Sequence, residues 1–258
     1  MRMRLAILSR NKSLHSTRRM LSESRKLGIQ CEIVNPLDCQ LIIDGERSAI
    51  MLGAQALQKY DAVLPRIGAS ITDYGLSVVQ QFETLGTYTV NTSQSIASSR
   101  DKLRSLQILT SVGLKVPATV LTRTTRGLRA ALECVKGLPV VLKVIQGTHG
   151  VGVMLIHTPI ALDSVMPTLW GLQQDVMVQQ FVAEGAGRDY RVFVLGGKVY
   201  AAMMRTAALG DFRSNIHQGG AGSLVKLPKS YERAAILAAK VLGLEVAGVD
   251  LMESHQGP

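Results

Sequence analysis

The feature that most constrains the fold is a glycine-rich loop between two apolar runs. The first run spans 138–144 and contains Lys143, the loop carries Gly147, Gly150 and Gly152, and the second run spans 153–156. Two short apolar runs joined by glycines indicate a β-hairpin. A Walker loop or a dinucleotide-binding loop is disfavoured, because each places a helix directly after its glycines. Taken alone, this hairpin is either plain turn chemistry or a loop whose amides close over a polyphosphate while Lys143 neutralises it.

The composition is that of a folded chain with a sizeable core. The 258 residues are 47% hydrophobic and 19% charged, which suffices for one large or two small domains. No apolar run is long enough to span a bilayer, and the first run is too short for a signal peptide, so we expect no membrane partner. Cys31, Cys39 and Cys134 lack the spacing of a metal site, which points to reduced thiols and a cytoplasmic protein.

The charge balance indicates an anionic partner. The formal net charge is +10, but the basic residues are scattered and only 4% of the chain is aromatic. Because no basic cluster is interleaved with aromatic residues, no direct contact with nucleic acid is expected. Nucleotide phosphates or an acidic substrate suit the excess of positive charge.

The first part of the chain alternates between strands and helices. The pattern predicts strands at 4–9, 31–34, 61–64 and 88–91, helices at 13–27 and 72–85, and a hairpin within 41–51. This alternation predicts a small parallel sheet flanked by helices. A ligand crevice is then expected at the carboxyl ends of the strands, where Ser9, Arg10, Asn35, Arg66 and Asn91 lie. Arg66 is either a surface residue or a bidentate clamp for a carboxylate.

The second part of the chain begins after two short helices at 93–99 and 101–112, for the second of which Asp101 is the expected N-cap. We therefore predict one domain over 1–95 and another over 106–258. The expected elements of the second domain are helices at 125–136, 159–171 and 231–242, strands at 139–143, 153–156, 176–182 and 246–252, and a hairpin at 189–204 around Gly196-Gly197.

Three features of the second domain bear on chemistry. Gln180 and Phe181 end an apolar strand and either meet an adenine edge or form an interdomain linker. The segment 210–220 is polar and glycine-rich, which suits an active site better than a core. Asp250 places a carboxylate in an apolar strand, so it needs a partner, either a metal ion or an Arg or Lys.

Several separated segments together resemble one family. The Lys143 loop, Gln180-Phe181, Asp189-Tyr-Arg191, the stretch 211–215 and the stretch 246–250 follow the order seen in ATP-grasp ligases, and more narrowly in the RimK family. The stretches 7–10, 35–37, 65–68 and 100–105 resemble that family too. The resemblance implies an α/β pre-ATP-grasp domain with a small parallel sheet, followed by a two-lobed α+β ATP-grasp fold.

The resemblance also implies roles for individual residues. Lys102 and Lys143 would contact the ATP phosphates, and the loop with Gly147, Gly150 and Gly152 would close over them. Gln180 and Phe181 would face the adenine, and Asp189 the ribose. Arg213, Ser214 and Asn215 would line the phosphates, with Arg205, Arg213 and Asn215 as the catalytic groups and Asp250 as a ligand of Mg²⁺ or Mn²⁺.

The implied activity is ATP-dependent addition of free L-glutamate to the acidic C-terminus of a ribosomal protein through an acyl phosphate, by a homo-oligomeric enzyme. The alternatives are a ligase for another amino acid or acceptor, and a nucleotide-binding module without full ligase activity. The chain departs from the family pattern at Gln180, where the family often has Glu, and at Gly257-Pro258, after which the family continues with further metal ligands. We therefore expect a fragment of a longer enzyme with little ligase turnover of its own.

Overall fold

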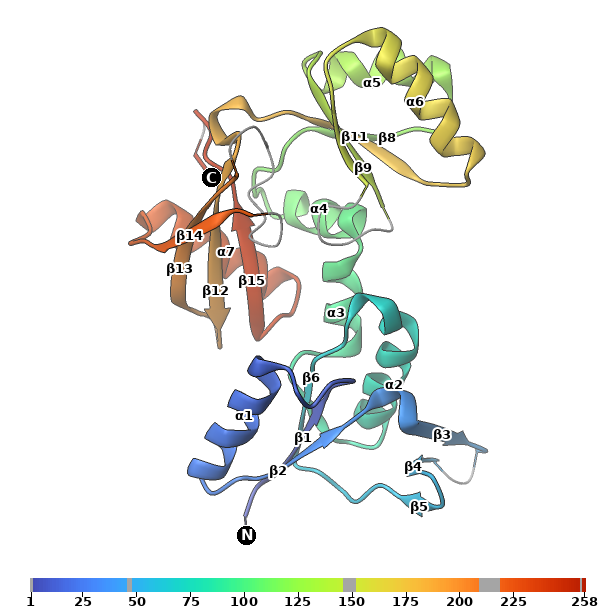
Figure 1. Cartoon of the computed structure of the whole chain (residues 1–258), viewed down its shortest axis with the longest axis vertical. Helices are drawn as coiled ribbons and strands as arrows, with labels where there is room; N and C mark the ends of the chain where they lie inside the picture. The colour runs from blue at the N-terminus through green and yellow to red at the C-terminus, as the bar shows by residue number, and fades with distance from the viewer. Residues whose placement is uncertain (1, 46–47, 146–151, 209–218, 256) are drawn as a thin grey trace. The chain divides into compact units, whose positions relative to one another are not determined.

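A computed structural model describes residues 2–45, 48–145, 152–208, 219–255 and 257–258 (Figure 1). The chain divides into two compact units. The first unit consists of residues 1–98 and 243–245, and the second of residues 99–242 and 246–258. Each unit has its own sheets and packed interior.

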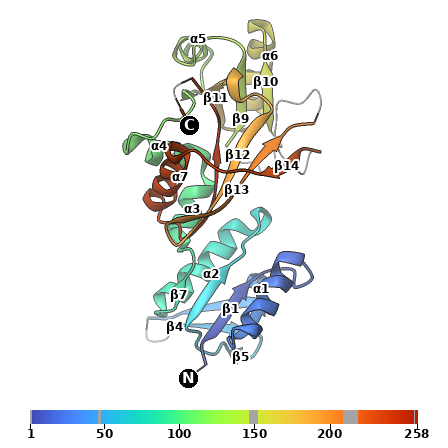
Figure 2. The same ribbon diagram turned by 90° about the vertical axis from the view of Figure 1, so that its left-hand side faces the viewer.

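The first unit contains the predicted parallel sheet. Its strands are β1 (Arg4–Leu8), β2 (Gln30–Val34), β6 (Ala62–Pro65) and β7 (Tyr88–Thr89), in the order β2-β1-β6-β7 with every pair parallel. Helices α1 (His15–Lys26) and α2 (Thr72–Thr84) lie on opposite sides of this sheet (Figures 1 and 2). Ala6, Leu8 and Val63 of the strands join Val78 and Phe82 of α2 in one buried cluster, so apolar burial fixes the helix on the sheet.

The predicted hairpin of the first unit is present with one strand more than expected. Strands β3 (Cys39–Ile43) and β4 (Ser48–Leu52) pair antiparallel, and β5 (Gln55–Ala56) adds a short third strand. The Tyr74 hydroxyl of α2 donates to the carbonyl oxygen of Cys39 at 2.5 Å. Short 3-10 helices at Pro36–Asp38 and Ala69–Ile71 complete the connections, and α3 (Ser93–Arg100) leads into the second unit.

One sheet of the second unit carries the predicted lysine-bearing hairpin. It has the order β10-β9-β11-β8, with β8 (Thr119–Leu121), β9 (Val140–Val144), β10 (Val153–Ile156) and β11 (Val176–Gln180). Strands β9 and β10 are antiparallel, with Lys143 opposite Val153, which confirms the hairpin. Leu128 of α5 (Thr125–Cys134) and Met166 of α6 (Pro159–Gly171) share a buried cluster with Leu142, so both helices pack on this sheet.

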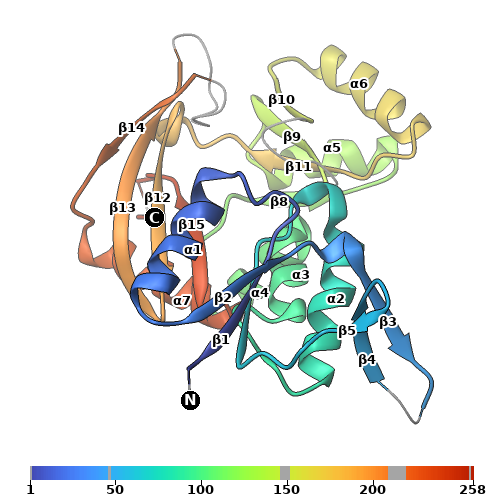
Figure 3. The same cartoon turned by 60° about the horizontal axis from the view of Figure 1, so that its bottom comes forward.

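The other sheet of the second unit has the order β14-β13-β12-β15 (Figure 3). It contains β12 (Arg188–Leu195), β13 (Lys198–Thr206), β14 (Ala221–Leu224) and β15 (Val246–Leu251), all antiparallel, with the 3-10 turn Ala183–Gly185 before β12. Helix α7 (Lys229–Val241) packs on it through Tyr231, whose ring meets that of Tyr190 edge-on at 5.3 Å. Strand β14 was not predicted, because all four of its residues are exposed and give no alternation.

Helix α4 (Lys102–Ser111) begins as the sequence predicts. The Asp101 side chain accepts hydrogen bonds from the backbone N–H groups of Leu103 and Arg104, which confirms its role as N-cap. Helix α4 also places Lys102 in its first turn. Among the described helices, none combines the length and the apolar character needed to cross a bilayer.

Candidate functional site

Four charged residues gather where β12, β13 and β15 run side by side. We call Asp189, Arg191, Arg205 and Asp250 the arginine–aspartate cluster. The strand register sets Asp189 opposite Arg205 and Arg191 opposite Asp250. Arg205 Nε donates to Asp189 Oδ1 at 2.7 Å, and Arg205 Nη2 contacts both Asp189 Oδ2 and, at 3.0 Å, Asp250 Oδ1. Arg205 therefore links two carboxylates from two neighbouring strands.

The cluster has a buried half and an accessible half. The side chains of Arg205 and Asp189 are only 8% and 12% exposed, whereas those of Arg191 and Asp250 are 41% and 48% exposed. The hydrogen bonds that Arg205 donates to Asp189 raise the pKa of Arg205. Desolvation by the surrounding protein raises the pKa of Asp250, against which both guanidinium groups act. A ligand thus meets Arg191 and Asp250 first, while the Arg205–Asp189 pair supports them from below.

Arg191 reaches Asp250 across a glycine. Its Nη1 donates to Asp250 Oδ1 at 2.8 Å and to the carbonyl oxygen of Gly248 at 3.3 Å. A Cβ atom on Gly248 would lie 3.3 Å from both Cζ and Nη1 of Arg191, which is tighter than ordinary contact. The absence of a side chain at position 248 therefore lets the Arg191 guanidinium lie close to β15.

We expect Gly248→Ala to weaken the ion pair between Arg191 and Asp250. Because this pair is partly exposed, the coupling should amount to only about 0.5–1 kcal/mol. Alanine is otherwise favoured over glycine in a strand, so the effect is measured as a double-mutant cycle with Arg191→Ala by denaturant unfolding. Equal effects of Gly248→Ala in the parent and in the Arg191→Ala background would show that Gly248 makes no room for Arg191.

Two lysines lie at the end of the β9–β10 hairpin. Lys102 Nζ donates to the carbonyl oxygens of Val144 at 3.0 Å and Ile145 at 2.9 Å, the last described residues before the glycine loop. Burial lowers the pKa of Lys102. Burial, and then the charge of Lys102, lowers the pKa of Lys143, while Asp250 acts in the opposite direction. The charge of Asp250 on β15 thus acts on Lys143 of β9, which belongs to the other sheet.

The structure describes only some of the other residues that the family resemblance implies for nucleotide binding. Gly152 has a φ of +75°, and a Cβ there would lie 3.0 Å from Val144, so the end of the hairpin requires glycine. Outside the described residues lie Gly147, Gly150, Arg213, Ser214 and Asn215. Their roles stay predictions.

Gln180 and Phe181 stand at the end of β11, as the strand prediction placed them. The backbone N–H of Gln180 donates to the carbonyl oxygen of Ala118 at 2.8 Å, and its Oε1 accepts from the N–H of Ala118 at 3.4 Å. The preceding Gln179 is buried and donates to Thr119 at 2.7 Å. These bonds hold the strand end in place, and contact of Gln180 and Phe181 with adenine stays a prediction.

The structure adds Arg191 to the site and gives Asp189 a partner. Sequence reasoning assigned no role to Arg191, although Asp189 and Arg191 are two residues apart on a strand and therefore share a face. That spacing was the available signal. Asp189, which the family resemblance places at a ribose, has both carboxylate oxygens bonded to Arg205. Its contact with a ribose stays a prediction.

The polar strand ends of the first unit form local contacts. Arg10 Nη1 donates to Ser70 at 2.9 Å and Arg66 Nη2 donates to Ser16 at 3.3 Å. The Asn35 side chain accepts from the N–H of Leu37 at 3.2 Å and caps a 3-10 helix. A carboxylate clamp at Arg66 stays a prediction.

The donor chemistry of Asp250 fits a hard cation held jointly with phosphates. Within the described residues no group of three or more His, Cys, Asp or Glu gathers to hold a metal ion. Both arginine contacts of Asp250 fall on Oδ1, so Oδ2 is open among the described residues. Mg²⁺ commonly takes one or two carboxylates and completes its shell with water and substrate phosphates. Asp250 suits one such position.

Comparison with known proteins gives matches over nearly the whole chain. A RimK PreATP-grasp domain model matches residues 3–96, and a RimK-like ATP-grasp domain model matches residues 99–258. Proteins named probable alpha-L-glutamate ligase are 46% identical in Aliivibrio fischeri (strain MJ11) and in Pseudoalteromonas translucida (strain TAC 125). Each alignment spans 256 residues, which is 99% of this chain and 85% of the relative.

Solved structures share the fold at low sequence identity. A RimK domain protein ATP-grasp from Sphaerobacter thermophilus superposes with a TM-score of 0.75 at 22% identity, covering 99% of this chain and 88% of that one. A D-alanine–D-alanine ligase from Bacillus anthracis gives 0.72 at 18% identity, covering 99% and 84%. The ATP-grasp ligase PsnB, complexed with a phosphomimetic variant of minimal precursor, Mg and ADP, gives 0.71 at 17% identity, covering 100% and 87%.

Proposed function

This chain belongs to the RimK family of ATP-grasp ligases, and we propose that it adds free L-glutamate to the acidic C-terminal tail of a ribosomal protein. Ligases of this family form C–N bonds, and the fold binds ATP with Mg²⁺. The choice of amino acid and acceptor is the proposed part. It rests on relatives named alpha-L-glutamate ligases and on a net charge of +10, which suits an acidic acceptor.

The observation that carries the proposal is the accessible carboxylate of Asp250 on β15, which is ion-paired with Arg191 and Arg205 and acts electrostatically on Lys143 of β9. These residues come from the two sheets of the second unit, and the accessible Arg191 stands beside Asp250. A site with cations on one sheet and an accessible carboxylate on the other suits a metal–polyphosphate. The lysines would neutralise phosphate oxygens, and Asp250 would hold the metal ion that the phosphates also bind.

The proposed reaction has two steps. A carboxylate oxygen of the acceptor attacks the γ-phosphorus of ATP, the bond to ADP breaks, and an acyl phosphate forms. The amino group of glutamate then attacks the carbonyl carbon, inorganic phosphate leaves with the bonding electron pair, and the nitrogen loses a proton. Both steps gain from positioning and from neutralised charge, so no covalent bond to the enzyme is required.

The residues present divide these tasks. Lys102 and Lys143, with the loop of Gly147, Gly150 and Gly152, would hold the phosphates, and Gln180 and Phe181 the adenine. Arg205 would act with Arg213 and Asn215 on the developing anionic charge, and Ser214 would line the phosphates. Asp189 would keep Arg205 in place through its bidentate bond, besides its proposed contact with the ribose. Asp250 would hold Mg²⁺, or Mn²⁺ as the alternative, and the bound ion would supply charge neutralisation.

The cellular setting completes the proposal. Cys31, Cys39 and Cys134 are free thiols, which suits the reducing cytoplasm. The ATP-grasp ligase PsnB, which shares this fold, has been solved in complex with its precursor peptide, which supports a peptide acceptor here. We also propose that the enzyme works as a homo-oligomer, which sedimentation can test.

Mass spectrometry of candidate acceptors tests the function. The protein, at a concentration close to that of the acceptor so that slow turnover suffices, is incubated with ATP, Mg²⁺, an acidic-tailed ribosomal protein and one amino acid at a time. We expect increments of whole glutamyl residues with glutamate and none without ATP. An increment with a different amino acid would contradict the proposed specificity for glutamate but retain the ligase activity. If the protein binds ATP but no amino acid gives an increment, the proposed ligase activity is wrong and the chain is a nucleotide-binding module.

A further inference from the structure

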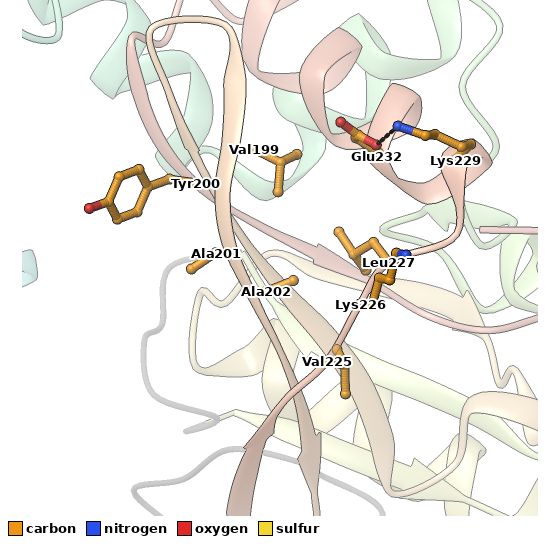
Figure 4. Close-up of a pocket in the computed structure, with 9 residues that line it drawn as sticks. All are labelled: Val199, Tyr200, Ala201, Ala202, Val225, Lys226, Leu227, Lys229 and Glu232. Atoms are coloured by element: carbon orange, nitrogen blue, oxygen red, sulfur yellow. Dashed lines mark hydrogen bonds and ion pairs between the residues drawn. The ribbon is translucent and has the colours of Figure 1, made fainter.

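A groove of about 260 Å³ lies beside β13 on the second unit, away from the residues assigned to nucleotide binding in sequence (Figure 4). One wall is the start of β13, and the other is the segment that connects β14 to α7 together with the first turn of α7. The lining residues are Val199, Tyr200, Ala201, Ala202, Val225, Lys226, Leu227, Lys229 and Glu232.

The groove runs along a strand edge that is open among the described residues. Strand β14 pairs only with Met203–Thr206 of β13, and the N–H of Val225 then donates to the carbonyl oxygen of Ala202 at 3.1 Å. Before that point, Lys198, Val199 and Ala201 of β13 pair with β12 alone, and the register shifts at Tyr200, which stands opposite no residue of β12. An unpaired strand edge offers backbone donors and acceptors to a further extended chain.

Apolar side chains stand on both sides of this edge. Val199, Ala202 and Leu227 lie on the side of the groove toward α7, whereas the Tyr200 ring points to the opposite side (Figure 4). Tyr200 is 75% exposed, and its ring meets that of Phe193 edge-on at 6.2 Å. A strand added here would send alternate side chains to the two sides, so apolar residues at every second position would find contacts.

The charges around the groove select an acidic occupant. Lys198, Lys226 and Lys229 are exposed, and the single acid of the lining, Glu232, is bonded to Lys229 at 3.1 Å. Edge-to-edge pairing with a second copy would bring these lysines against their own copies, and like charges across a strand pair are destabilising. An extended peptide with carboxylates meets no such cost.

We propose that this groove docks an extended acidic peptide as an added strand along residues 198–201, and that the peptide is the segment of the acceptor protein next to its acidic tail. The second half of this statement rests on the proposed function. From Tyr200 to Arg205 the strand advances five residues, about 17 Å. A docked acceptor would therefore have a short length of tail available to reach the arginine–aspartate cluster.

Direct binding without ATP tests the groove separately from catalysis. The probe is a fluorescein-labelled octapeptide of alternating leucine and glutamate, with the leucine–lysine octapeptide as its control. Fluorescence anisotropy gives the affinity, and Lys226→Glu is expected to weaken binding of the acidic probe about five- to tenfold. Lys240→Glu makes the same charge change at the far end of α7 and is expected to leave the affinity unchanged. Hydrogen exchange with the probe bound is expected to show slower exchange at 198–201.

The outcomes separate the two proposals. Equal affinity of the parent and Lys226→Glu, or protection that omits 198–201, would overturn the docking site whatever the ligase assay shows. A dimer in sedimentation velocity that Lys226→Glu changes would also overturn it, because a second copy would then occupy the edge. Probe binding that follows the expected pattern, together with no glutamyl transfer, would retain the docking site and reject the acceptor.

Discussion

Replacing Arg205 by alanine is expected to lower the free energy of unfolding by about 3 kcal/mol or more, which is a large fraction of the stability of a typical domain. The reason is the carboxylate left behind. Asp189 is 12% exposed and receives two bonds from Arg205, so the variant would keep a nearly buried charge without its bidentate partner. Denaturant unfolding followed by circular dichroism measures the change.

Two controls separate this effect from the loss of any arginine. Arg123→Ala removes an exposed pair with Asp175 in the same unit, with side chains 59% and 45% exposed, and should cost less than about 1 kcal/mol. The double variant Asp189→Asn with Arg205→Met leaves no unpaired charge at the pair and should recover most of the loss. If Arg205→Ala cost no more than Arg123→Ala, the buried pair would not support the cluster.

The sequence predicted the strands of the site better than the contacts between their side chains. The hairpin around Gly196-Gly197 follows from two apolar runs and a glycine turn, which are local signals. The apolar strand around Asp250 also predicted that this carboxylate needs a partner, but it left open whether the partner is a metal ion or an Arg or Lys side chain. The structure supplies Arg191 and Arg205, because the register of β12 against β13 and β15 sets them beside it. Register across three strands depends on contacts distant in sequence, which periodicity does not encode.

Exposure explains the remaining differences. Residues 221–224 form a strand only because β13 offers an edge there, so no internal pattern marks them. The open edge at 198–201 could likewise not be predicted, since an unpaired strand edge has the same sequence pattern as a paired one. A reader of the sequence alone finds the strands but not which edges are free.

Replacing Lys143 by alanine is expected to weaken ATP binding by roughly 30- to 100-fold, because a half-buried ammonium that bonds a phosphate contributes about 2–3 kcal/mol. The same residue should make binding depend on pH. Burial and Lys102 lower the pKa of Lys143 in the free protein, despite the opposing charge of Asp250. Bound phosphates favour the protonated ammonium and raise that pKa. Between the two pKa values the protein therefore takes up a proton on binding ATP, and affinity falls as pH rises through this window.

Calorimetry with a non-hydrolysable ATP analogue in two buffers of different ionisation enthalpy measures the proton uptake without turnover. Lys143→Arg keeps the charge but stays protonated, so its uptake should fall to the share of Lys102, whose pKa burial also lowers. Uptake in Lys143→Arg equal to that of the parent would place the proton elsewhere and remove Lys143 from the phosphates. Reduced proton uptake by Lys143→Arg, with its affinity for the analogue retained, would show that the ammonium of Lys143 faces the phosphates of ATP.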